Sequence, residues 1–164
     1  MPKKRNLEFL KVIAALVLIL VIASFSVLAI IQHFSVEGFT PINIIRVEGT
    51  TILIGNNCTA ITADTSPERA LSIELGLERK IENRPNSHDT IVNIMKAFNI
   101  TLEGVQITNF DGNYYYSDMI LSFKDKVLRI ETLPSDAIAI ALRTNSSIYI
   151  NSTLLQKEGE NICL

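Results

Sequence analysis

Residues 126–143 read Lys-Val-Leu-Arg-Ile-Glu-Thr-Leu-Pro-Ser-Asp-Ala-Ile-Ala-Ile-Ala-Leu-Arg, and they predict a strand that passes directly into a helix. The apolar and β-branched residues at the start of this stretch favour a strand. Pro134 then presets the first turn of a helix, where Ser135 and Asp136 can accept hydrogen bonds from unpaired backbone amides. The stretch therefore predicts a domain with both element types, in which a polar cluster opens a helix.

The other apolar runs group into strands and helices that do not alternate strictly. Further strands are predicted at residues 43–48, 51–54, 59–63, 101–108, 114–123 and 147–150, and further helices at 67–77 and 87–98. Strand runs separated from helices in this way are typical of the α+β class. The sequence thus predicts a mixed, mainly antiparallel sheet packed with about three helices and preceded by one transmembrane helix.

The transmembrane helix is expected at Val12–Ile31, a run of 20 residues without a charge. About 20 apolar residues are needed to cross the hydrocarbon core of a bilayer. Lys3, Lys4 and Arg5 precede the run, and the positive-inside rule then places the N-terminus in the cytoplasm. A cleavable signal peptide ending near Ala29 is the competing interpretation. We expect contact with membrane lipid through residues 12–31, and a single-pass protein of the cell membrane with its C-terminal domain outside.

Three segments follow from this assignment. Residues 1–33 form a cytoplasmic stub and the transmembrane helix, residues 34–41 form a linker, and residues 42–164 form the folded domain. An isoleucine-rich exterior domain of this kind is compatible with an archaeal surface protein. Cys58 and Cys163 both follow the apolar run, so an oxidising compartment favours a disulfide between them, with two free buried thiols as the alternative.

The charge of the chain bears on its partners. The whole sequence has 15 basic and 17 acidic side chains, and its 164 residues carry a net charge of −2. After residue 31 the balance is 11 basic against 16 acidic side chains, a net charge of −5. Affinity for nucleic acid comes mainly from neutralisation of phosphates by basic side chains. Extended, non-specific nucleic-acid binding is therefore excluded, and any such site must be local.

Two polar helix starts are the candidates for chemistry. Residues 84–90 read Arg-Pro-Asn-Ser-His-Asp-Thr and place His88 and Asp89 in the first turn of one helix, while Ser135 and Asp136 open another. A histidine beside a carboxylate can transfer protons or bind a metal ion. An acidic residue in the first turn also simply complements the helix dipole, so both motifs have a purely structural explanation.

If the two helix starts converge, their free amides form a site for a phosphate group. Carboxylates beside that site can hold a divalent cation, Mg²⁺ or Mn²⁺, and activate water for attack on a phosphodiester. The expected catalytic residues are Glu68, His88, Asp89 and Asp136. The expected substrate contacts are Arg84, Ser135 and Arg143, and the expected metal ligands are Glu131 and Asp136.

The order and spacing of these motifs resemble the bifunctional nuclease family. The resemblance covers about residues 42–159, and its most specific parts are Arg84-Pro85, His88-Asp89, residues 105–112 and residues 134–143. Where the family usually reads Asp-x-Arg-Pro-Ser-Asp, this chain has Glu-Thr-Leu-Pro-Ser-Asp at 131–136, so that Leu133 replaces an arginine. The resemblance implies an α+β fold, self-association and cleavage of DNA and RNA.

Two functions therefore remain open. The first is a membrane-anchored nuclease that hydrolyses phosphodiester bonds in DNA, RNA or both. The second is a non-catalytic binding or assembly domain at the cell surface, built on the same fold. Both are compatible with a homo-oligomer, and only the first requires nucleic acid as a partner.

Overall fold

The computed structural model describes residues 13, 14, 16–18 and 36–163. The chain divides into two compact units, Met1–Ser35 and Val36–Leu164. Among the residues described, no helix is both long enough and apolar enough to cross a membrane. The N-terminal stub at residues 1–11 and most of the predicted transmembrane segment at 12–31 lie outside the described residues.

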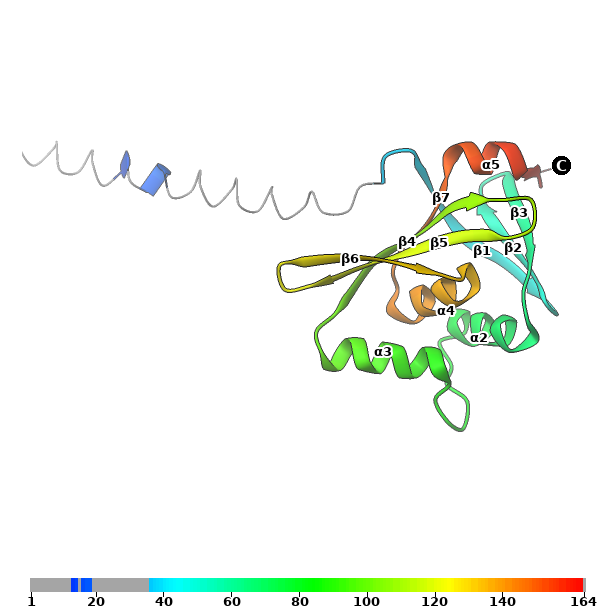
Figure 1. Cartoon of the computed structure of the whole chain (residues 1–164), viewed down its shortest axis with the longest axis horizontal. Coiled ribbons are helices and arrows are strands. Elements are labelled where there is room, and N and C mark those ends of the chain that lie inside the picture. Colours follow the sequence, from blue (N-terminus) through cyan, green and yellow to red (C-terminus); the bar gives the residue numbers. More distant parts are fainter. Residues whose placement is uncertain (1–12, 15, 19–35, 164) are drawn as a thin grey trace, which may run out of the picture. The chain divides into compact units, whose positions relative to one another are not determined.

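An eight-stranded sheet forms the body of this unit, with the order β6-β5-β4-β7-β1-β2-β3-β8 (Figure 1). Strands β4 and β7 pair in parallel, and the other neighbouring strands pair antiparallel. The bounds are β1 Phe39–Glu48, β2 Thr51–Asn56, β3 Thr59–Asp64, β4 Thr101–Phe110, β5 Tyr115–Phe123, β6 Lys126–Thr132, β7 Ile148–Asn151 and β8 Glu160–Asn161. The predicted α+β class with a mixed, mainly antiparallel sheet is confirmed.

Strand β1 joins the two halves of the sheet. Its first residues, Phe39–Ile42, pair with β7, and its later residues, Asn43–Glu48, pair with β2. The register shifts between Ile44 and Arg46, where a bulge lets the strand change direction. The strand begins at Phe39, inside the segment that the sequence suggests as a linker.

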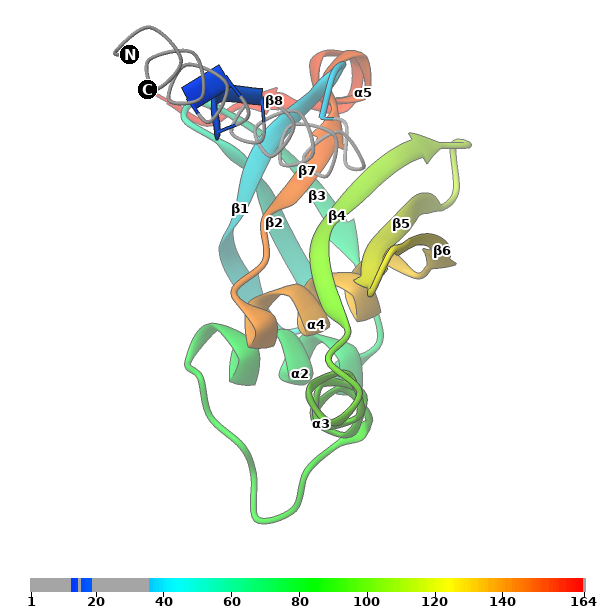
Figure 2. The same cartoon turned by 90° about the vertical axis from the view of Figure 1, so that its left-hand side faces the viewer.

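Four helices accompany the sheet in residues 36–163: α2 Pro67–Leu77, α3 Ser87–Ala97, α4 Pro134–Thr144 and α5 Ser152–Glu158. Helices α2, α3 and α4 gather at one end of the strands, and α5 lies at the other end (Figure 2). The expectation of about three helices misses α5. With seven residues, α5 is too short to show a helical period, and it depends on the Asn151 side chain, which accepts hydrogen bonds from the amides of Thr153 and Leu154.

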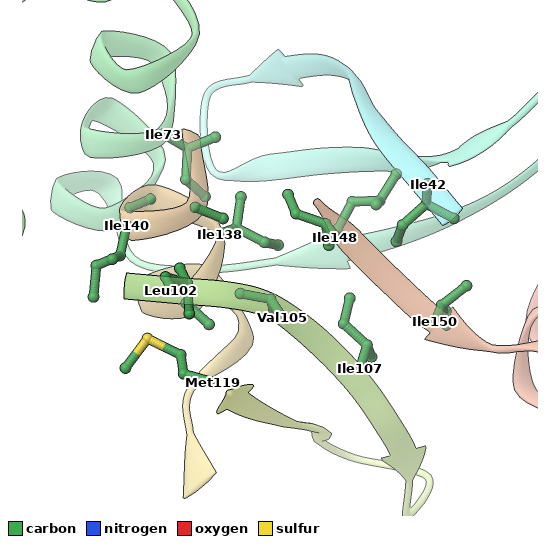
Figure 3. Close-up of a cluster of buried hydrophobic side chains, with 14 of the residues drawn as sticks. Ile42, Ile73, Leu102, Val105, Ile107, Met119, Ile138, Ile140, Ile148 and Ile150 are labelled. Atoms are coloured by element: carbon green, nitrogen blue, oxygen red, sulfur yellow. The ribbon is translucent and has the colours of Figure 1, made fainter. Parts of the chain in front are cut away.

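The core lies between the sheet and helix α4. The middle of α4, Ala137–Ala141, is at most 1% exposed, because α2 and α3 pack on one side of it and β4 and β5 on the other. Isoleucine dominates this cluster; Figure 3 shows Ile138 and Ile140 of α4 near Ile73 of α2. A helix covered on both sides needs apolar residues all round, which explains the unbroken run of alanine and isoleucine.

A disulfide joins Cys58 and Cys163, whose Cα atoms are 4.9 Å apart. Cys58 lies in the turn between β2 and β3, and Cys163 follows β8. Because β8 pairs with β3 at Thr59 and Ala60, the disulfide and two strand pairings hold the C-terminal residues against the same hairpin.

Candidate functional site

The candidate site is built where helices α2 and α4 cross. The buried face of α2 carries Ala70, Ser72, Ile73 and Gly76. A Cβ atom added to Gly76 would lie 3.0 Å from both the Leu142 Cβ and an Arg143 nitrogen of α4, so the glycine permits the close approach of the two helices. This approach brings polar side chains of α2 beside the first turn of α4, and α3 supplies the third side of the site.

Five side chains form a chain of hydrogen bonds across the three helices. The Arg69 Nε of α2 donates to the Asp136 Oδ1 of α4 at 2.9 Å, and the His88 Nε2 of α3 lies 3.3 Å from the same oxygen. The other ring nitrogen of His88, Nδ1, lies 2.8 Å from the Ser72 Oγ. The Asn86 side chain donates to this Ser72 oxygen at 3.1 Å. The predicted convergence of His88 and Asp136 is therefore present in the structure.

The acceptor at the end of this hydrogen-bond network determines the tautomer of His88. The Asp136 carboxylate can only accept, so a neutral imidazole that is hydrogen-bonded to it carries its proton on Nε2. The His88 Nδ1 then accepts from the Ser72 hydroxyl. Ser72 is only 3% exposed, whereas the Asp136 side chain is 28% exposed, so the carboxylate is the end of the chain that meets solvent.

A pocket of about 390 Å³ lies over this network. Its lining includes Glu68, Arg69, His88 and Asp136, together with apolar side chains of α3, α4 and β5. Glu68 is in the first turn of α2, and hydrogen bonds from its own backbone amide and from Ser66 lower the pKa of its carboxyl group. The pocket thus combines one guanidinium, one imidazole and two carboxylates.

A second ion pair lies deeper between the same helices. The Arg143 Nε donates to the Asp89 Oδ1 at 2.6 Å, and the two side chains are 7% and 6% exposed. Arg143 Nη1 also donates to the backbone oxygens of Ser72 and Ala139, each at 2.8 Å. Within the described part of the chain, Arg143 Nη2 is buried without a hydrogen-bond partner. Arg143 therefore ties α2, α3 and α4 together.

Asp89 also closes a capping box at the start of α3. Its amide donates to the Asn86 Oδ1, and the Asn86 amide donates to the Asp89 Oδ2. Burial by itself raises the pKa of the Asp89 carboxyl group, but the hydrogen bonds from Arg143 and from the Asn86 amide outweigh it and hold this pKa below its ordinary value. Asp89 is therefore charged and fully engaged in the structure.

The other predicted site residues lie apart from this pocket. Arg84 is exposed in the connection between α2 and α3. Glu131 of β6 and Ser135 of α4 line a neighbouring groove, whereas Asp136 lines the pocket. Arg84 and Arg143 were predicted to contact the phosphate. The structure does not place either of them in the pocket that His88 and Asp136 line.

Three residues of the network were not predicted from the sequence, namely Arg69, Ser72 and Asn86. Arg69, Ser72 and Gly76 follow the i, i+3, i+7 spacing of one helix face, which is the signal that a polar, close-packed face of α2 meets another helix. Asn86 has the position of an N-cap three residues before an acid, which is the pattern of a capping box.

The two predicted metal ligands, Glu131 and Asp136, are not part of a larger group of ligands in the described structure. Among residues 36–163, no group of three or more His, Cys, Asp or Glu side chains lies close enough to hold a metal ion. The Asp136 Oδ1 already accepts from Arg69, so a cation at this oxygen would have to displace the guanidinium. Dependence on Mg²⁺ or Mn²⁺ stays a prediction.

Comparison with known proteins identifies the family. The model of the bifunctional nuclease domain matches residues 60–162, which include α2, α3, α4 and all the residues of the network. The chain belongs to the bifunctional nuclease domain family. Its similarity also extends to two uncharacterized proteins of Mycobacterium tuberculosis, MT1877 of strain CDC 1551 and Rv1829 of strain H37Rv. Each is 33% identical over 76 residues, which are 46% of this chain and 44% of the relative, so the match spans less than half of either protein.

Proposed function

We propose that this member of the bifunctional nuclease domain family hydrolyses phosphodiester bonds in nucleic acid at the Arg69–Asp136–His88 site. The observation that carries the proposal is the shared Asp136 oxygen, which accepts from a guanidinium and an imidazole at the rim of a pocket. Nothing in the packing of the core requires three ionisable side chains to meet at a pocket. Hydrolysis of a phosphodiester can use a proton acceptor beside a cation that binds phosphate.

Asp136 is the proton acceptor in this proposal. Its Oδ1 is held by Arg69 and His88, and its Oδ2 has no hydrogen-bond partner among the described residues. Oδ2 takes a proton from water as the water oxygen bonds to phosphorus, and it returns that proton to the ester oxygen that leaves. The carboxylate then ends the reaction in the protonation state in which it began.

Arg69 and His88 have separate tasks. Only the Nε of Arg69 is hydrogen-bonded in the described structure, so its two Nη groups are available to the non-bridging phosphate oxygens. His88 donates Nε2–H to Asp136 and fixes the orientation of the carboxylate, while the Ser72 hydroxyl donates to the His88 Nδ1. Asp89 and Arg143 hold α3 and α4 in place beneath the site.

The membrane-anchored form of this function rests on the sequence. The uncharged run Val12–Ile31 behind Lys3, Lys4 and Arg5 supports a single-pass anchor with the catalytic domain outside the cell. A disulfide between Cys58 and Cys163 supports an oxidising compartment for that domain.

The test is cleavage of single- and double-stranded DNA and RNA by the full chain, with Mg²⁺, Mn²⁺ or EDTA. We expect Asp136→Asn to lower the rate by about 10²- to 10⁴-fold, the usual range for a proton-transfer group. His88→Ala should lower the rate as well, because the carboxylate loses the donor that orients it. Asp118→Asn is the matched control, because Asp118 forms a comparable ion pair with Arg129, at 2.8 Å, in the β5–β6 hairpin. Equal rates for Asp136→Asn, Asp118→Asn and the unaltered chain would contradict the proposal.

A non-catalytic assembly domain is the second candidate, and exposed apolar side chains favour it. Leu128 and Ile130 of the edge strand β6 are 49% and 42% exposed, and Ile94 and Phe98 of α3 and its C-cap are 51% and 63% exposed. Exposed apolar residues on an edge strand promote association. This function predicts a defined homo-oligomer by sedimentation and no cleavage of any nucleic acid.

A further inference from the structure

A second cavity, which we name the aromatic groove, continues from the pocket of the candidate site. It has a volume of about 570 Å³ and shares Arg69 and Thr132 with that pocket. One wall comes from β2 and β3, and the other from β6 and the turn between β4 and β5. The first residues of α2 and α4 close the end beside Arg69. A molecule held in the groove therefore reaches the proposed catalytic residues directly.

The end of the groove beside Arg69 is built for an anion. Leu133 is the N-cap of α4, and its side chain accepts no hydrogen bond. The Asp136 and Ala137 amides donate to the Leu133 oxygen, and Pro134 has no N–H, so the Ser135 amide is the first-turn donor that has no acceptor among the described residues. Ser135 is 9% exposed, lines the groove, and its hydroxyl has no hydrogen-bond partner within the described residues. The free Nη groups of Arg69 lie at the same end of the groove. A hydroxyl without a partner, beside the Ser135 amide and a guanidinium, matches one phosphate group.

The rest of the groove does not suit phosphate. Asp64 and Glu131 both line it, and their carboxylates repel a backbone of like charge. The same carboxylates accept hydrogen bonds, which the N–H groups on the pairing edge of a nucleobase can donate. In a duplex these N–H groups are engaged with the opposite strand. The two carboxylates therefore favour an unpaired base, whose N–H groups on the pairing edge are free to donate.

Aromatic side chains provide the surface for such a base. Tyr114 is 71% exposed and Tyr116 is 38% exposed, and both line the groove. The Tyr116 hydroxyl donates to Asp111 at 2.7 Å, which fixes its ring. Leu133, 52% exposed, lies on the same lining. Bases stack on exposed aromatic rings irrespective of sequence, because every base has an aromatic face.

We infer that the aromatic groove binds an unpaired nucleotide of a single-stranded nucleic acid, next to the bond that is cut. The phosphate of this nucleotide lies between Arg69 and Ser135, its base lies on Tyr114 and Tyr116, and Glu131 accepts from the base edge. The inference rests on the proposed function for the position of the cut bond, and it names the substrate class as single strands in preference to duplexes.

The test measures binding by fluorescence anisotropy with the full chain in a His88→Ala background, in which cleavage of the strand is slowed. The probes are a short fluorescein-labelled DNA strand and the same strand annealed to its complement. We expect tighter binding of the single strand, and a loss of about tenfold on Tyr114→Ala, within the range for one stacked base. Ser135→Ala should cost about fivefold, the worth of one hydrogen bond to phosphate.

Phe98→Ala is the matched control, because Phe98 is an aromatic of similar exposure, 63%, that does not line the groove. Equal affinity for single strand and duplex, or an equal effect of Tyr114→Ala and Phe98→Ala, would overturn the inference. Cleavage assays separate this outcome from a failure of the nuclease proposal. Cleavage that depends on His88 but not on Tyr114 would contradict the inference about the groove alone. Strand binding that depends on Tyr114, without any cleavage, would contradict the nuclease proposal alone.

Discussion

Two arginine–aspartate pairs lie between the same three helices, and they differ in what surrounds them. The Asp89–Arg143 pair is 6% and 7% exposed, and further hydrogen bonds from Arg143 reach backbone oxygens of α2 and α4. The side chains of the Asp136–Arg69 pair are 28% and 39% exposed and line a pocket. The first pair also borders a cavity, but nearly all of its surface is covered by protein, whereas the second pair keeps donors and an acceptor available to a ligand.

The difference shows how similar residue types acquire different roles. A buried pair is costly to break, because the remaining charge is left without a partner in the protein interior. A pair that meets solvent contributes little to stability, and either member can interact with a substrate instead. The distinction predicts that altering Arg143 affects folding and altering Asp136 affects chemistry.

The largest effect is expected for Arg143→Ala. The change leaves the Asp89 carboxylate buried without its cation, and we expect the free energy of unfolding to fall by about 3–5 kcal/mol. Urea denaturation of the full chain measures it. The double change Asp89→Asn with Arg143→Met removes both charges and keeps the capping oxygen, and it should recover most of the loss. A loss below about 1 kcal/mol for Arg143→Ala would contradict the distinction between the two pairs.

A smaller effect is expected for Ser72→Ala. This change tests whether the buried Ser72 hydroxyl acts through His88 on the Asp136–Arg69 pair. Without the hydroxyl, the His88 Nδ1 loses its donor and the imidazole is no longer held in the orientation that donates to Asp136. We expect kcat for nucleic-acid cleavage to fall about tenfold, near the worth of one hydrogen bond, with KM unchanged. A rise in KM at constant kcat would instead assign Ser72 to substrate binding.

The smallest effect is the pH dependence of the stability difference between the unaltered chain and the Asp89→Asn variant, which also tests the buried pair. The pKa of Asp89 in the folded protein is below its ordinary value of 3.8, so the stability that its charge contributes is complete above pH 3.8. This contribution is lost as the pH falls through the lowered pKa. The difference in unfolding free energy between the unaltered chain and Asp89→Asn should therefore be constant above pH 3.8 and shrink below it. A difference that persists at lower pH would contradict the assignment.

Much of the fold follows from local sequence patterns. The predicted strands and the three longer helices agree with the structure because each has its own period, cap or turn, as with Pro134 in the first turn of α4. The pairing of β1 with both β7 and β2 could not be predicted, because it depends on a bulge within one strand. Helix α5 was missed since seven residues show no period.

The candidate site was predicted in part, for a related reason. His88 and Asp136 each lie at a helix start that can be recognised in the sequence. The structure places the His88 Nε2 3.3 Å from the Asp136 Oδ1. Asp89 and Arg143 stand in the same motifs, but they face the interior, and a linear sequence does not show which side of a helix start another helix covers. Arg69 comes from the first turn of α2 and Ser72 from the next, where only the three-dimensional packing against α4 distinguishes a functional residue from a surface one.

The position of β1 in the sheet has a practical consequence for the boundaries of a stable fragment. The family match begins at Ala60, whereas β1 and β2 precede it and lie between β7 and β3. A protein cut to residues 60–162 would lack Ile42, Ile52 and Ile54 of the core and would present two unpaired strand edges in the middle of its sheet. Such a fragment should aggregate during purification, even though it holds every residue of the candidate catalytic network.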